Sequence, residues 1–178
     1  MTIRAFENNM PQLATGVFVD DTALVIGDVQ IGRDSSIWPF TVVRGDVNQI
    51  RIGARSNIQD HSTIHVTHKS HFNPDGVACV VGDDVTVGHQ VVLHACRIGN
   101  TCLIGMGSII MDNAQIDECT IIGAGSLVTE NSVLEGGYLW IGRPARRLRA
   151  LSDKEREYLV YSAQNYVRLK QRYQESQI

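Results

Sequence analysis

The sequence predicts a mainly β protein, a parallel β-helix of hexad repeats that is followed by one C-terminal α-helix. An aliphatic side chain returns every six residues over most of the chain, and a small or β-branched residue lies two positions before nearly every one. A helix repeats its apolar face about every 3.6 residues and a strand every 2, so neither explains a period of six. Both sets of side chains must point inward from short strands, with three hexads closing one triangular coil.

The aliphatic positions keep their phase except at three breaks. They are Val19, Val25, Ile31, Ile37 and Val43; Ile52, Ile58 and Ile64; Val81, Val87 and Leu93; and Ile98, Ile104, Ile110, Ile116, Ile122 and Val128. Each coil would bury these side chains against the next coil. Glycine often follows the aliphatic residue, as at Gly53 and Gly82, and we interpret these glycines as corners where the chain turns.

Length and composition are typical of a single soluble domain. The chain has 178 residues, of which 43% are hydrophobic, and we expect one domain with a β-helix over about 15–145 and a helix over about 152–175. The longest apolar runs are too short to cross a membrane. The N-terminal residues MTIRAFENN lack the apolar core of an export signal. A net charge of −3 argues against nucleic acid or anionic lipid as partners.

The four cysteines predict packing residues and no disulfide framework. They lack C-x-x-C spacing, and Cys79, Cys96 and Cys102 occupy the small inward position of the repeat. We expect these three thiols to be buried and reduced, which suits a cytoplasmic protein.

The three breaks in the repeat all flank histidines. The segment RGDVNQIR adds three residues between Val43 and Ile52, and residues 66–80 must loop out around an Asn-Pro-Asp-Gly turn. The step from Leu93 to Ile98 is one residue short.

A helix is predicted after the repeat fades. Ser152 and Glu155 have the spacing of a capping box at its N-terminus. Its apolar stripe is expected to pack back along the flank of the β-helix, and consists of Leu159, Ala163, Tyr166 and Tyr173.

Repeat phase pairs two of the six histidines as metal ligands and indicates that a third comes from another subunit. His65 and His94 each follow an inward aliphatic residue by one position, and if residues 66–80 are an excursion they lie one coil apart. Stacked strands are about 4.8 Å apart, which suits two imidazoles on one zinc ion. His89 lies on the preceding face in another phase, so it must point away from them. We therefore expect a homotrimer with interfacial metal sites, His65 and His94 from one chain and His89 from the next. A lone surface histidine is usually only solvated, so the polar residues near these histidines are needed as further evidence for a metal site.

These neighbours carry a resemblance to a known family. The runs VVRGDVNQIRIGARSNIQDHSTIHV, VTVGHQVVLHACRIGN and IGMGSIIMDNAQI resemble the gamma-class carbonic anhydrases over nearly the whole chain, including Gly142, Pro144 and the terminal SAQNYV. The resemblance implies a left-handed β-helix trimer, against the usual right-handed crossover. It also implies that His65, His89 and His94 bind the metal.

The resemblance further implies roles for the surrounding polar residues. Gln59 would hydrogen-bond the metal-bound water, and Asn57 would orient Gln59. Arg44 and Asp60 would pair across the subunit interface, and Asp46 would support assembly or line the site. Tyr166 would lie near the substrate pocket. For Arg44, Asp46 and Asp60 a structural ion-pair role is an equal alternative, and Tyr166 also fits as a packing residue.

The implied reaction is reversible hydration of carbon dioxide to bicarbonate. Three neutral imidazoles on zinc lower the pKa of bound water from ~15.7 to ~7, which supplies metal-bound hydroxide at neutral pH. Iron or cobalt would also suit the ligands. Strongly active family members carry glutamates where this chain has Val47 and His68. The acidic proton shuttle is therefore missing, and His68 is either a substitute relay or a solvated loop residue, which leaves weak activity and no activity open.

Three alternative functions share the same scaffold. Hexad β-helices also form acyltransferases that bind coenzyme A between subunits and use one histidine as general base. A metal site of this kind can also hydrolyse coenzyme A thioesters. The third alternative is a metal-binding scaffold without turnover.

Overall fold

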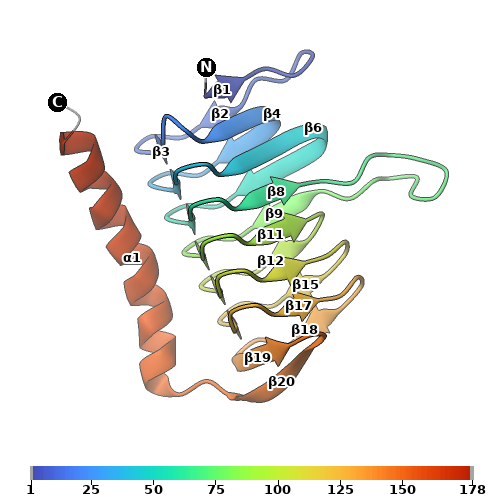
Figure 1. Cartoon of the computed structure of the whole chain (residues 1–178), viewed down its shortest axis with the longest axis vertical. Helices are drawn as coiled ribbons and strands as arrows, with labels where there is room; N and C mark the ends of the chain where they lie inside the picture. Colours follow the sequence, from blue (N-terminus) through green and yellow to red (C-terminus); the bar gives the residue numbers. More distant parts are fainter. Residues whose placement is uncertain (1, 177–178) are drawn as a thin grey trace.

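The computed structural model describes residues 2–176, which wind into a parallel β-solenoid with a single helix along its flank (Figure 1). The first face consists of β3 (Phe18–Val19), β5 (Ser36–Ile37), β7 (Asn57–Ile58), β10 (Thr86–Val87), β13 (Leu103–Ile104), β16 (Ile121–Ile122) and β19 (Tyr138–Gly142). These strands are parallel, and β20 (Ala145–Ala150) closes this eight-stranded sheet by pairing antiparallel with β19. The predicted β-helix with a C-terminal helix is confirmed.

The other two faces belong to one twelve-stranded sheet, because two long strands continue around the corner between them. These are β4 (Leu24–Ile31) and β6 (Val42–Ile52). The second face also has β1 (Ile3–Arg4), β8 (Thr63–His65), β11 (Val92–His94), β14 (Ile109–Ile110) and β17 (Leu127–Val128). The third also has β2 (Gln12–Leu13), β9 (Cys79–Val81), β12 (Arg97–Ile98), β15 (Gln115–Ile116) and β18 (Val133–Leu134).

The interior is filled by columns of side chains that share one register. On the first face Ile58 pairs with Val87, Val87 with Ile104, and Ile104 with Ile122, and all four are fully buried. Burying each such side chain contributes about 1.5–3 kcal/mol relative to leaving it in water. Every residue of the predicted small inward set is buried as well, from Ala23 to Ser126. The six-residue repeat therefore identified the core correctly.

The glycines that follow the aliphatic residues have a different purpose from the one expected. The residue that takes the left-handed conformation at a corner lies three positions after the aliphatic residue, as at Arg55 (φ 56°) and Asp84 (φ 56°). A Cβ added to Gly53 would lie 2.6 Å from the backbone carbonyl of Gly82 in the next coil. Our interpretation of these glycines as turning residues was wrong, because close stacking of neighbouring coils is what excludes a side chain.

Two of the three breaks are seen directly in the predicted form. The register between β4 and β6 shifts by three residues, because Gly27 pairs with Gly45 whereas Val29 pairs with Ile50. The segment between β8 and β9 leaves the body of the solenoid as a projecting loop, whose base is closed by a bridge between Thr67 and Val77 (Figure 1).

Helix α1 (Asp153–Ser176) runs from the C-terminal end of the solenoid back toward its N-terminal end (Figure 1). The capping box is confirmed, since the Ser152 amide donates to Glu155 Oε2 at 2.9 Å and the Glu155 amide donates to Ser152 Oγ at 3.3 Å. In the predicted stripe, Leu159 and Ala163 are buried, whereas Tyr166 and Tyr173 pack edge-to-face against Trp38. The helix therefore covers the first face.

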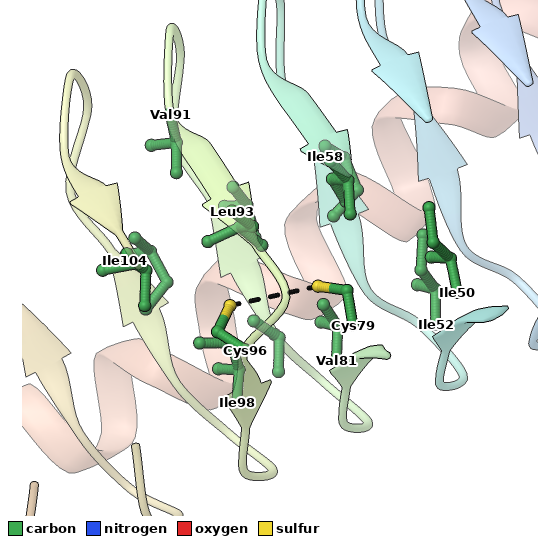
Figure 2. Packing of buried hydrophobic residues seen from close by; sticks show 14 of the residues in the cluster. Ile50, Ile52, Ile58, Cys79, Val81, Val91, Leu93, Cys96, Ile98 and Ile104 are labelled. Carbon is green, nitrogen blue, oxygen red and sulfur yellow. Dashed lines mark hydrogen bonds between the residues drawn. The ribbon is translucent and has the colours of Figure 1, made fainter. Parts of the chain in front are cut away.

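The buried thiols lie within the aliphatic core, as Figure 2 shows for Cys79 and Cys96. Their sulfur atoms are 3.9 Å apart, and all four cysteines are free. Cys102 is buried as predicted, and burial raises its pKa to about 12. Cys119 is only partly buried. Over residues 2–176, no helix combines the length and apolar character needed to span a bilayer.

Candidate metal centre

The strand register places His65 and His94 side by side on neighbouring coils. They pair at the ends of β8 and β11, and their ring centroids are 5.3 Å apart. His65 Nδ1 lies 3.2 Å from His94 Nε2. Two nitrogens bound to one tetrahedral ion at about 2.0–2.1 Å are about 3.3–3.4 Å apart, so the separation of these two nitrogens suits a shared metal.

Each of the three selected histidines contacts a carboxylate through one ring nitrogen. In His65 and His94 this is the nitrogen that does not face the neighbouring imidazole. Asp46 Oδ1 lies 3.0 Å from His65 Nε2, and Asp112 Oδ1 lies 2.6 Å from His94 Nδ1. His89 Nδ1 lies 2.6 Å from Asp60 Oδ2. A carboxylate behind an imidazole fixes the ring and its tautomer, and leaves the opposite nitrogen to bind a metal.

The remaining histidines lack this support, since no ion pair with a carboxylate is found for them in the described part of the chain. His61 stacks on Phe40 with ring centroids 5.0 Å apart, and His71 lies against Phe72 in the projecting loop. His68 is exposed in the same loop. Carboxylate contact therefore separates the three predicted ligands from the other three histidines.

His89 lies at the opposite edge of the second face from His65 and His94. It follows β10, and its contact with Asp60 joins the corners of two neighbouring coils. No group of three histidine, cysteine or acidic side chains within residues 2–176 is arranged to hold a metal. This agrees with the expectation that His89 points away from the other two histidines of its own chain.

The surroundings of His65 favour its neutral, metal-binding form. Burial lowers the pKa of His65, and the Arg44 guanidinium adds to this, although the hydrogen bond with Asp46 opposes it. Burial alone would raise the pKa of Asp46, but the hydrogen bonds from Arg44 and His65 outweigh burial and lower it. Asp46 is therefore a carboxylate that accepts from both neighbours, with Arg44 Nη1 at 2.5 Å.

Gln59 and Asn57 are buried at the end of the first face and contact each other. Gln59 Nε2 donates to Asn57 Oδ1 at 3.0 Å, as the predicted orienting role of Asn57 requires. Tyr166 of α1 packs edge-to-face against Trp38, and its hydroxyl is within hydrogen-bonding reach of Gln59. Burial dominates and raises the pKa of Tyr166. These residues share the edge of the solenoid that carries His89.

Arg44 and Asp60 each have a partner within the chain. Arg44 pairs with Asp46, and Asp60 pairs with His89. Asp46 also contacts His65 directly, and its role in assembly or in lining a site stays a prediction. The pairing of Arg44 with Asp60 across an interface stays a prediction.

Asp112 and Thr67 were not selected from the sequence. The Thr67 hydroxyl donates to Asp112 Oδ2, so the base of the projecting loop is tied to the carboxylate behind His94. Asp112 follows Ile110 by two residues, and the register pairs Ile110 with Leu93. Counting repeat positions for acidic residues in the coil that follows each histidine would have identified Asp112 from the sequence.

An apolar ladder lies between the two histidine edges on the outside of the second face. Val42, Thr63, Val92, Ile109 and Leu127 are in register from coil to coil, and Val92 is 36% exposed. A continuous stripe of outward β-branched and aliphatic side chains is typical of a surface that contacts another subunit.

Comparison with known proteins places the chain in a family. The model of the bacterial transferase hexapeptide (six repeats) family matches residues 95–130. The protein YrdA of Escherichia coli is 53% identical over 96% of this chain and 93% of its own length. A carbonic anhydrase of Geobacillus kaustophilus is 44% identical over 96% of this chain and 90% of its own.

The mitochondrial gamma carbonic anhydrase 2 of Arabidopsis thaliana is 42% identical over 90% of this chain, which spans 58% of that protein. The chain belongs to the gamma carbonic anhydrase family of hexapeptide-repeat proteins. A solved structure of a hexapeptide transferase family protein from Anaplasma phagocytophilum has a TM-score of 0.89, 40% identity, and coverage of 97% of this chain and 98% of its own. Strand pairing alone does not specify the handedness of the winding, so its left-handed sense stays what the resemblance implies.

Proposed function

We propose that this member of the gamma carbonic anhydrase family hydrates carbon dioxide reversibly at a metal site shared by two subunits of a homotrimer. The observation that carries the proposal is the pair of ring nitrogens of His65 and His94, 3.2 Å apart, with a carboxylate behind each ring. His89 has the same carboxylate support but lies on the other edge of its own chain. A neighbouring subunit supplies the missing third ligand in this arrangement.

Zinc is the proposed metal, and iron or cobalt suits the same ligands. A divalent ion held by three neutral imidazoles keeps its charge and an open position, and so supplies a nucleophilic water at neutral pH. The residues of the chain would do the rest. His65, His89 and His94 would hold the ion, while Asp46, Asp60 and Asp112 would keep the imidazoles oriented.

Gln59 is proposed to orient the attacking water, and Tyr166 to border the substrate. Both lie next to Asp60 and hence next to His89. The apolar ladder on the second face is proposed to form the subunit contact, which would bring this edge of one chain to the His65 edge of another. Arg44 is proposed to support that contact through Asp46 and the partner's Asp60.

Proton export is where this chain departs from strongly active relatives. Val47 is 44% exposed, and His68 is exposed at the start of the projecting loop. Neither position offers a carboxylate. An imidazole can relay protons near neutral pH, which makes His68 the candidate. The His68→Ala variant tests this relay, since an unchanged hydration rate in well-buffered and weakly buffered solution would exclude it.

Acyl transfer is the second candidate, because a close structural relative is described as a hexapeptide transferase family protein. Such an enzyme does not require three carboxylate-supported histidines that meet between subunits. Hydrolysis of a coenzyme A thioester at the same metal site is a related candidate.

Free buried thiols fit the proposed cytoplasmic location, where reducing conditions prevail.

The test combines metal content, oligomeric mass and turnover. Purified protein is expected to be a trimer with one metal per chain and to hydrate carbon dioxide in a stopped-flow assay after loading with zinc, iron or cobalt. The His89→Ala variant is expected to lose metal and remain trimeric, whereas His71→Ala serves as the matched control and keeps both. A metal-free wild type that cleaves or transfers acyl groups from acyl-coenzyme A would replace the proposal. Bound metal without any turnover would indicate a scaffold.

A further inference from the structure

Four buried polar side chains form a continuous hydrogen-bonded row from helix α1 to Gln59. Gln59 Nε2 donates to Asn57 Oδ1 at 3.0 Å, and Asn57 Nδ2 donates to Thr86 Oγ1 at 3.1 Å. Thr86 Oγ1 lies 3.0 Å from Ser162 Oγ. Their exposed fractions are only 1% for Asn57, 4% for Gln59, 5% for Thr86 and 7% for Ser162. This row crosses from the β-solenoid to the helix, and Thr86 and Ser162 are 76 residues apart.

The donors and acceptors of the row are assigned from the Asn57 amide, whose Nδ2 also lies 3.4 Å from the Val85 carbonyl, a group that only accepts. Asn57 receives a hydrogen bond on its oxygen, so its amino group must face Thr86. The Thr86 hydroxyl accepts from that amino group, and its own proton is then free to go to Ser162 Oγ. If Asn57 were flipped, its amino group would face the amino group of Gln59 and its oxygen would depend on a hydroxyl proton from Thr86. In a buried row such a mismatch is costly, because unpaired polar groups lose their hydration.

The same logic determines which end of the Gln59 amide is available. Its amino group is directed at Asn57, and burial raises the pKa of the nearby Tyr166 phenol although a hydrogen bond with Gln59 opposes this. No buried side-chain polar atom in residues 2–176 lacks a partner, and Gln59 Oε1 makes none of the hydrogen bonds found there. The oxygen of the Gln59 amide is therefore the atom that faces the outside.

We propose that Thr86 and Ser162 are positioning residues that hold the Gln59 amide with its oxygen toward the metal site. This inference rests on the proposed function and deepens it, because it assigns helix α1 a part in orienting the attacking water. An oxygen in this place accepts a hydrogen bond from the water and so aligns a lone pair for addition to carbon dioxide. A flipped amide would donate to the water instead and would occupy that lone pair.

The experiment compares Thr86→Val with Thr86→Ser and Ser162→Ala, and uses Thr120→Val as a matched control. Thr120 is a buried threonine in another coil, whose hydroxyl donates to the Asp117 carbonyl outside the row. In metal-free protein, hydrogen exchange of the Gln59 and Asn57 side-chain amides is followed by ¹⁵N NMR, with Gln59→Glu used to assign the glutamine signal. In zinc-loaded protein, kcat/KM for hydration and the metal content are measured.

Thr86→Val is expected to increase exchange of both amides about tenfold or more and to lower kcat/KM by a similar factor, with metal content unchanged. Thr86→Ser is expected to restore both properties to within about twofold, and Thr120→Val to leave them unchanged. Slow amide exchange in Thr86→Val would overturn the inference, whether or not activity falls. Because the exchange measurement needs no metal, it remains decisive if the zinc-loaded wild type proves inactive, an outcome that would reject only the proposed function.

Discussion

Mixing two inactive variants tests whether the metal site is shared between chains. In the proposed trimer each chain would contribute one half-site with His65 and His94, which pair on neighbouring strands, and another half-site with His89. The variant His94→Ala keeps the second half-site and His89→Ala keeps the first. Neither homotrimer has a complete site, so both are expected to purify without metal and without hydration activity.

Random mixed trimers restore a predictable fraction of sites. In an equal mixture, a given interface is complete only when a His89→Ala chain supplies the histidine pair and a His94→Ala chain supplies His89. Each choice has a probability of one half, so about a quarter of the interfaces should bind metal, and activity should recover to about a quarter of the wild-type value. The two variants are unfolded together and refolded, and metal per chain is measured with the hydration rate.

The matched control mixes His65→Ala with His94→Ala. Both variants damage the same half-site, so no interface can be complete and no recovery is expected. Failure of the first mixture to regain metal, in trimers shown by mass to contain both chains, would refute a site built from two subunits. Recovery in the control mixture would refute the requirement for the histidine pair.

Three further predictions concern orientation, stacking and the helix cap. Asp112→Ala is expected to weaken zinc binding about 10–100-fold in a chelator competition, because His94 loses its carboxylate, whereas Asp75→Ala in the exposed loop should not change it. Gly53→Ala is expected to reduce the free energy of unfolding by about 3 kcal/mol through its clash with the next coil. Gly107→Ala should cost only about 1 kcal/mol, since its added Cβ meets nothing within 4 Å and only its φ of +69° is unfavourable; equal losses in urea unfolding would contradict this explanation. The hydrogen bond with Arg149, with a contribution from Ser152, lowers the pKa of Glu155 to about 2, so the stability it contributes is present above its ordinary pKa of 4.5 and is lost as the pH falls toward 2. The difference in Tm between wild type and Glu155→Gln should shrink over that window, and a difference that stays constant would argue against the ionised cap.

Some features of the molecule were determined by residues that are close in sequence or equal in phase. The hexad period specifies which side chains enter the core, and counting in that period was enough to place His65 opposite His94 across a loop that interrupts the repeat. The capping box at Ser152 and Glu155 is local, so its residues alone predicted the start of α1. In each case the physical cause is a rule that acts within one coil or one turn.

Tertiary structure decided the contacts that join separate coils or separate elements. The carboxylate of Asp112 reaches His94 from the next coil, and Ser162 reaches Thr86 from a helix 76 residues later, so neither partner is marked by local spacing. The glycines also depend on tertiary structure, because Gly53 is required by the backbone of the coil stacked on it and not by its own turn. Side-chain direction follows from local periodicity, whereas the distance between stacked backbones and the pairing of polar atoms exist only once the coils are packed.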